Sequence, residues 1–143
     1  MVRFWLTRVE GGSMEPTLRA GSLWPTRSLC PGDPVRRGDL VVAEPAAAGR
    51  RVVKRVVGLP GERVTLDGGR VTVDGRPLAE PYASASWYRG VFDVPDGSYL
   101  LLGDHRDASD DARTWPRPYA ARGELVGRLL RRHPATKGSL SVG

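Results

Sequence analysis

Apolar residues along this chain gather in short runs that glycine and proline separate. Eighteen glycines and twelve prolines punctuate the sequence and leave no stretch for a long amphipathic helix. The runs are rich in β-branched and aromatic residues, which is typical of strands. They are Phe4–Val9, Leu40–Ala43, Arg51–Leu59, Arg63–Leu66, Arg70–Val73, Ser98–Leu102 and Leu125–Leu130. We therefore predict an all-β domain with mostly antiparallel sheets.

Turn signals between the runs indicate how the strands connect. Asp67-Gly68-Gly69 lies between two runs and predicts an extended β-hairpin, and Asp74-Gly75 marks a further tight turn. Residues 79–96 have the composition of a loop insertion. We expect a single domain over residues 1–132 and a flexible tail over residues 133–143.

The charge of the chain narrows the choice of partners. Its 143 residues include 22 lysines and arginines against 16 acidic residues, a net charge of +6 that favours nucleic acid or an anionic lipid surface. The arginines are spread out and accompany no RNA-reading or zinc-finger pattern, so we expect no nucleic-acid partner. One cysteine, Cys30, and two distant histidines argue against a disulfide framework and a zinc site. No metal or other cofactor is expected.

Three segments carry residues suited to catalysis, and the first is Gly11–Leu18. It places Ser13 after two glycines and before a proline-containing turn. Glycines let a backbone approach a ligand closely. Ser13 is then either a nucleophile whose own N–H helps to hold an oxyanion, or a turn residue that caps local backbone.

The second segment, Arg51–Gly61, is a predicted strand that contains one of the two lysines, Lys54. Side chains alternate along a strand, so Lys54 shares a face with Val52 and Val56. If that face is buried, lost hydration lowers the pKa of the lysine and lets its neutral amine act as a general base. If it lies at the rim of a sheet, the stem covers apolar surface and the amine reaches water.

The third segment, Gly103–Arg113, follows an apolar run and is dense in acids and arginines. Interleaved charges of both signs favour ion pairs within the loop over a metal site. Asp111 and Arg113 are close enough in sequence to pair and brace the loop. Ser109 carries a hydroxyl that can orient a catalytic group.

In this order, the three segments resemble the boxes of the type I signal peptidases, the serine–lysine proteases that remove signal peptides. GSMEPTL resembles the nucleophile box, RRVVKRVVGLPGE the lysine box and GDHRDASDDAR the third box. RRGDLVV, VTLDGGRVTVDGRPLAEPY and ELVGRL fit as well, so the resemblance covers about residues 7–132. It implies the mostly antiparallel sheets of the signal-peptidase and LexA-like proteases.

The resemblance assigns roles to individual residues. Ser13 matches the nucleophile, Lys54 the general base, and Ser109 the serine that hydrogen-bonds the lysine. Gly11 stands where some members have a serine that adds an oxyanion donor. The positions that line the family's substrate pockets are matched by Met14, Leu18, Val52 and Val53. The positions that brace the site are matched by Arg55, Asp104, Arg106, Asp111 and Arg113.

The chain also departs from the family. In the third box, His105 replaces the usual asparagine and Ala112 the usual serine. Only twelve residues precede Ser13, where typical members have a membrane-spanning helix. The family implies membrane association with the site on the extracytoplasmic face, whereas this chain is expected to be a soluble or truncated catalytic domain. Phe4–Leu6 would form either a membrane contact or a first strand packed in the core.

The sequence thus predicts a serine endopeptidase that cleaves the signal or leader peptide of a preprotein after small residues, of the Ala-X-Ala type. A LexA-like self-cleaving regulator is one alternative, although no N-terminal helix-turn-helix is present. A protease dedicated to one partner's leader peptide is another. A non-catalytic basic module that binds anionic lipid or nucleic acid is the third.

Overall fold

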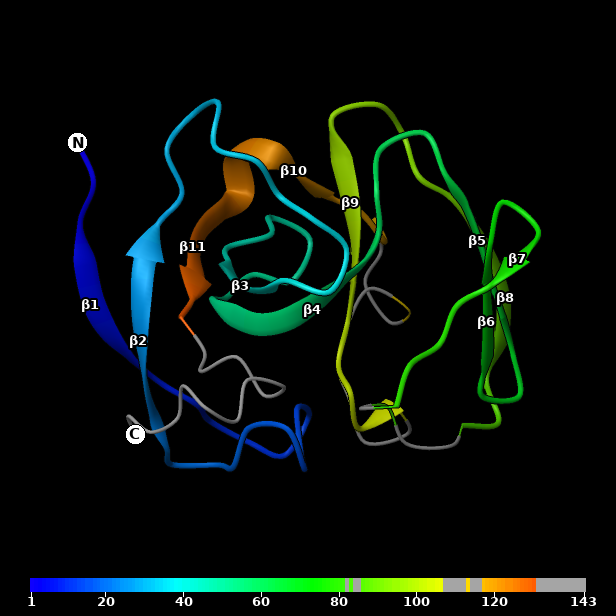
Figure 1. The fold of residues 1–143 in the computed structure, drawn as a ribbon, viewed down its shortest axis with the longest axis horizontal. Coiled ribbons are helices and arrows are strands. Elements are labelled where there is room, and N and C mark those ends of the chain that lie inside the picture. Colours follow the sequence, from blue (N-terminus) through cyan, green and yellow to red (C-terminus); the bar gives the residue numbers. More distant parts are fainter. Residues whose placement is uncertain (82, 84–85, 107–112, 114–116, 131–143) are drawn as a thin grey trace, which may run out of the picture.

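Figure 1 shows the fold in a computed structural model, which describes residues 1–81, 83, 86–106, 113 and 117–130. In these residues the strands form two antiparallel sheets, which confirms the predicted all-β class. The larger sheet has the strand order β1-β2-β11-β3-β4-β9-β10, and the smaller has the order β7-β6-β5-β8. The elements are β1 (Phe4–Arg8), β2 (Leu23–Ser28), β3 (Leu40–Ala43), β4 (Val52–Gly58), β5 (Arg63–Asp67), β6 (Arg70–Val73), β7 (Arg76–Pro77), β8 (Arg89–Asp93), β9 (Ser98–Leu102), β10 (Ala120–Ala121), the 3₁₀ helix η2 (Arg122–Glu124) and β11 (Leu125–Leu129).

Strand β4 lies inside the larger sheet, between β3 and β9. Its valines are covered on both faces of the strand, and Val53 is the one residue of the strand that is only partly buried. Val56 belongs to the main core cluster, to which both sheets contribute. Val53 packs against a second cluster, which contains Met14 and Leu18. The polar side chains of this strand are buried with it: Lys54 is 3% exposed and Arg55 4%.

The predicted hairpin connects β5 and β6 in the smaller sheet, on the right in Figure 1. Asp67 lies opposite Arg70, and the two residues between them turn the chain. Gly68 and Gly69 both have positive φ angles, of 59° and 92°. A left-handed backbone favours glycine, so the Asp-Gly-Gly sequence determines the position of the turn.

The interpretation of residues 79–96 as a loop insertion is wrong for its second half. β8 (Arg89–Asp93) lies there and pairs with the whole of β5. Its sequence, RGVFD, offers a weak pattern because Phe92 is its one buried side chain, whereas Val91 is 59% exposed. The strand is therefore specified mainly by pairing with β5, where Phe92 lies opposite Val64.

Strand β2 was not predicted, because Pro25 lies in its middle and proline usually disqualifies a central strand. β2 nevertheless pairs with β1 on one side and β11 on the other. Pro25 lies opposite Leu6, and its carbonyl accepts a 2.8 Å hydrogen bond from the Leu130 N–H. The strand thus loses only the one donor that proline lacks.

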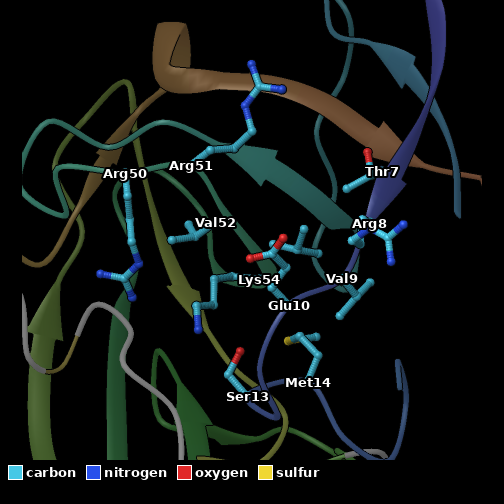
Figure 2. A pocket seen from close by; sticks show the side chains of 11 residues that line it. Thr7, Arg8, Val9, Glu10, Ser13, Met14, Arg50, Arg51, Val52 and Lys54 are labelled. Atoms are coloured by element: carbon cyan, nitrogen blue, oxygen red, sulfur yellow. The ribbon is translucent and has the colours of Figure 1, made fainter. Parts of the chain in front are cut away.

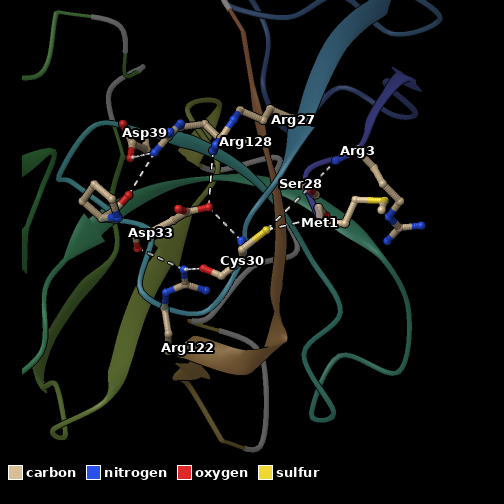
Figure 3. Close-up of polar contacts among 10 residues, drawn as sticks. Met1, Arg3, Arg27, Ser28, Cys30, Asp33, Asp39, Arg122 and Arg128 are labelled. Atoms are coloured by element: carbon tan, nitrogen blue, oxygen red, sulfur yellow. Dashed lines mark hydrogen bonds and ion pairs between the residues drawn. The ribbon is translucent and has the colours of Figure 1, made fainter.

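The turn after β2 is held by polar contacts (Figure 3). A carboxylate oxygen of Asp33 accepts a 2.8 Å hydrogen bond from the Cys30 N–H and faces Arg27 at 3.3 Å. The Cys30 hydrogen bond, with help from Arg27, lowers the pKa of Asp33. Arg122 donates to the carbonyls of Cys30 and Asp33 at 2.9 and 3.0 Å. Cys30 therefore belongs to a structural turn that ties β2 to the segment before β11.

The first strand presents apolar side chains on both of its faces. Trp5 points inward and crosses Gly127 so closely that a Cβ added there would lie 2.9 Å from the indole ring. Phe4 and Leu6 point outward and are 66% and 62% exposed. The run thus forms a packed strand and leaves an apolar outer face. Within the described ranges, no helix has the length and hydropathy that crossing a bilayer requires.

Candidate active site

Ser13 lies in a tight turn that follows β1. Gly11 has a φ of +74°, which turns the chain away from the strand. The Glu15 N–H donates to the Gly12 carbonyl at 3.1 Å, and the Leu18 N–H donates to the Met14 carbonyl at 2.9 Å. These bonds fix the segment from both sides of Ser13, whose side chain lines a cleft.

Lys54 approaches the same cleft from β4, where it lies opposite Val41. The residue is only 3% exposed, which agrees with the buried-face alternative and not with an amine at the sheet rim. Figure 2 shows the Lys54 amine and the Ser13 hydroxyl pointing toward each other from the strand and the turn. The fold thus brings together two side chains that are far apart in sequence.

The cleft has a volume of about 360 Å³ and is formed by the end of β1, the serine turn and the start of β4. Met14, Val52 and Val53 line it, at positions where substrate-pocket residues were expected. β9 pairs with β4 only from Arg55 onward, so the cleft lies beside the part of β4 ahead of that pairing. Among the residues that the structure describes, the lining consists of Thr7, Arg8, Val9, Glu10, Ser13, Met14, Arg50, Arg51, Val52, Val53 and Lys54.

Leu18, which the resemblance matches to a substrate-pocket position, lies outside this cleft, and its role in a pocket stays a prediction. Leu18 is fully buried and is absent from the cleft lining. The turn that carries its N–H back to the Met14 carbonyl points the side chain into the second core cluster, beside Leu40 and Leu129. Leu18 therefore anchors the serine segment in the core.

A buried polar network joins the three sequence boxes. Arg55, the neighbour of Lys54 on β4, forms a bidentate ion pair with Asp104, with N···O distances of 2.8 and 2.7 Å. The side chains are 5% and 0% exposed. The second Asp104 oxygen also accepts a 2.6 Å hydrogen bond from the Thr17 hydroxyl of the serine segment. Asp104 thus ties the lysine strand and the serine turn to the start of the third box.

His105 adds backbone support directly behind the serine. Its N–H donates to the Ser13 carbonyl at 2.9 Å, and its Nδ1 lies 3.3 Å from the Gly12 carbonyl oxygen. A hydrogen bond at the second position requires the tautomer that carries a proton on Nδ1. The histidine that replaces the family's asparagine therefore contacts the backbone on which the candidate nucleophile depends.

Arg106 anchors the third box to the segment that follows β7. Its guanidinium forms a bidentate ion pair with Glu80 at 3.0 and 2.8 Å, and its Nε donates to the Gly103 carbonyl at 2.7 Å. Arg113 donates to the Arg106 carbonyl, and its guanidinium lies 5.2 Å from the centre of the Tyr88 ring. Arg106 and Glu80 are 4% and 6% exposed at the side chain, so the pair is buried.

Two residues of this framework, Thr17 and Glu80, were not identified from the sequence. Thr17 lies in the nucleophile box, four residues after Ser13. Nothing in the neighbouring sequence indicates that its hydroxyl bonds to Asp104 in the third box. Glu80 lies outside all three boxes. Ser109 and Asp111, predicted to orient the lysine and to pair with Arg113, fall outside the described residues, as does Ala112. Their roles stay predictions.

Comparisons with known proteins identify the family of the chain. The family described as "Signal peptidase, peptidase S26" matches residues 1–132. Signal peptidase I of Leptolyngbya laminosa is 39% identical over 108 residues, which cover 68% of this chain and 52% of that protein. Probable signal peptidase I-2 of Synechocystis sp. is 36% identical over 132 residues, which cover 85% of this chain and 59% of that protein. The chain thus spans between half and two thirds of the length of these relatives.

A solved structure supports the same relationship. The crystal structure of a signal peptidase I from Enterococcus faecalis V583 superposes with a TM-score of 0.59 at 27% sequence identity. The match covers 69% of this chain and 98% of that one. The antiparallel β architecture is therefore common to both proteins.

Proposed function

Because the chain belongs to the signal peptidase family S26, we propose that it is a serine endopeptidase that removes signal or leader peptides with a Ser13–Lys54 dyad. The observation that carries the proposal is the convergence of the two side chains on one cleft (Figure 2). Along the sequence the two residues are separated by the segment that forms β2 and β3. A fold that brings a hydroxyl and a buried amine together has the components of nucleophilic catalysis.

The proposed reaction needs one base and one nucleophile. The neutral amine of Lys54 takes the hydroxyl proton as Ser13 Oγ attacks the scissile carbonyl carbon. The Ser13 backbone N–H helps to hold the resulting oxyanion. The C–N bond then breaks, and the amine product leaves with the proton from Lys54. A water molecule gives a proton to Lys54 as its oxygen attacks the carbonyl carbon of the acyl-enzyme. The ester bond to Ser13 Oγ then breaks, Lys54 returns the proton to Oγ, and the peptide leaves with a new carboxyl group.

The environment of Lys54 suits a general base. Its position on a strand covered on both faces removes water from around the amine. Desolvation disfavours the charged ammonium and favours the neutral form that the first proton transfer requires. Ser109 is proposed to orient this amine. Asp104 pairs with Arg55 on β4 and accepts the Thr17 hydrogen bond from the serine segment, so it holds β4 in place relative to the serine turn.

The cleft fits an extended peptide with small side chains near the bond. Met14, Val52 and Val53 give it apolar walls. The part of β4 ahead of the β9 pairing lies beside the cleft, so an extended substrate can align with it as an added strand. This geometry favours cleavage after an Ala-X-Ala segment of a preprotein. A leader-processing protease with a single substrate would use the same cleft.

The outer face of β1 and β2 is the proposed membrane contact. Phe4, Leu6 and Leu23 are each more than half exposed. They share a sheet face with Arg8 and Arg27, because Leu23 lies opposite Arg8 and Phe4 opposite Arg27. Apolar side chains bordered by arginines suit an anionic lipid surface.

Two variants test the dyad. Ser13→Ala removes the nucleophile, and Lys54→Met removes the amine but keeps an apolar stem in the buried site. We expect each to abolish cleavage of an Ala-X-Ala peptide while circular dichroism shows an intact fold. Ser22→Ala is the control, because it deletes a serine hydroxyl that only bonds locally, to the Arg19 carbonyl and the Trp24 indole. Substantial activity in folded Ser13→Ala or Lys54→Met would exclude the dyad.

A further inference from the structure

Three arginines border the cleft that contains Ser13 and Lys54. Arg8 ends β1, and Arg50 and Arg51 directly precede β4; all three are exposed and line the cleft. Figure 2 shows their side chains around the opening, with Glu10 between them. Glu10 is the one carboxylate in the described lining. Among the described lining residues, three arginines thus face one carboxylate at the mouth of the cleft, which gives this part of it a positive potential.

Two of these arginines are available to a ligand. Arg51 pairs with Glu44 at 2.6 Å, but the two side chains are 54% and 49% exposed. Such a solvated pair is weak and exchanges readily for another carboxylate. Arg8 forms no ion pair with any residue that the structure describes. An incoming acidic side chain would thus meet guanidinium groups without having to break a buried interaction.

The position of the arginines along β4 indicates where such a side chain lies in a substrate. Residues rise by about 3.3 Å along a strand, so Arg51 is about 10 Å from Lys54. If a peptide runs parallel to β4 with the residue before its scissile bond level with Lys54, its fourth residue before the bond is level with Arg51. The fifth residue is then level with Arg50. The residues nearer the bond face Met14 and the valines.

We propose that the cleft selects peptides that carry an acidic side chain at the fourth or fifth residue before the scissile bond. The position of the scissile bond, from which these residues are counted, rests on the proposed peptidase function. The preference for an acidic side chain rests on the arginines. The substrate class narrows from any Ala-X-Ala segment to leader peptides with a carboxylate just upstream of it. Glu10 opposes this preference and limits its size.

Binding tests the proposal without catalysis. The probes are two fluorescent Ala-X-Ala peptides that differ only by Glu or Gln at the fourth and fifth positions, and the protein is the full chain with Ser13→Ala. We expect the Glu peptide to bind about three- to tenfold more tightly at low salt, since each exposed pair contributes about 1.4- to 5-fold. The ratio should approach one in about 1 M salt, where charges are screened within about 3 Å.

Charge variants locate the preference. Arg8→Gln and Arg51→Gln should each lower the Glu-to-Gln binding ratio, and Glu10→Gln should raise it. Arg76→Gln makes the same charge change on β7, outside the cleft lining, and should leave the ratio unchanged. Equal binding of the two peptides, no measurable binding of the Glu peptide, or an equal effect of Arg76→Gln would overturn the proposal.

Cleavage of the same peptides by the unaltered chain separates this inference from the proposed function. If both peptides are cleaved at equal rates and bind equally, the peptidase function stands and the acidic preference is refuted. If the Glu peptide binds preferentially but neither peptide is cleaved, the preference stands and the proposed function fails.

Discussion

Replacing Asp104 by asparagine tests how strongly the buried network supports the site. The substitution keeps the shape of the side chain but removes the charge that faces Arg55 at 2.7 Å. Arg55 is 4% exposed, so its guanidinium would be left buried and without this counter-ion. Removing one partner of a buried ion pair costs about 3–5 kcal/mol.

For a domain of this size, 1 kcal/mol corresponds to about 3 °C in Tm. We therefore expect Asp104→Asn to lower Tm by about 10–15 °C, measured by circular dichroism or calorimetry. Asp93→Asn is the matched control, because Asp93 pairs with Arg63 at 2.7 Å with both side chains about two thirds exposed. Its Tm should stay within about 2 °C of the unaltered chain.

A double variant separates stability from site assembly. Arg55→Met with Asp104→Leu replaces the pair by apolar side chains, an exchange that is often neutral for stability. We expect it to recover most of the lost Tm but not the peptidase activity, because the hydrogen bond from Thr17 to Asp104 is lost. The reasoning would be refuted if Asp104→Asn melted like Asp93→Asn.

Two further predictions concern pH. The kcat/KM for an Ala-X-Ala peptide should rise with pH as Lys54 loses its proton, with an apparent pKa below about 10.4, the value of a free lysine; a midpoint at or above it would contradict the desolvation argument. Arg37 hydrogen bonds at 2.7 and 2.8 Å, with a further one from the Leu59 N–H, lower the pKa of Glu62 from 4.5. Because its pKa is lower in the folded state than in the unfolded state, the Glu62 carboxylate stabilises the fold at pH values above the unfolded-state pKa. This stabilisation is lost as the pH falls through the folded-state pKa. Glu62→Gln should therefore be less stable than the unaltered chain in urea at pH 7, with the gap closing toward acid pH; a gap that is independent of pH would contradict this.

Local signals explain why part of the fold could be predicted from the sequence. The bounds of β3, β6 and β9 match the predicted runs, because their apolar residues lie in the core and glycine or charge bounds them. The burial of Lys54 follows from the valines that flank it on β4. Arg55 and Asp104 were each expected to brace the site, and the structure places them together.

The remaining features depend on contacts between distant segments, which local patterns do not encode. Pro25 argues against a strand at β2 in the sequence, whereas in the structure β2 is held in the sheet by pairing with β1 and β11. The sequence matches Leu18 to a pocket position, but it does not show that the turn at Met14 directs the side chain into the second core cluster. Thr17 and Glu80 gain their roles from residues of the third box.

The network around Asp104 also bears on when activity can first appear during folding. Asp104 lies 49 residues from Arg55 and 87 from Thr17 along the chain. Contacts of such long range form only after most loop-closure entropy has been lost, so they belong to the late stages of folding. A partly folded chain, in which one sheet has formed before the third box docks, has no organised pair of hydroxyl and amine. On the proposed function, this order of events keeps the protein from cutting peptides, its own exposed segments included, until its structure is complete.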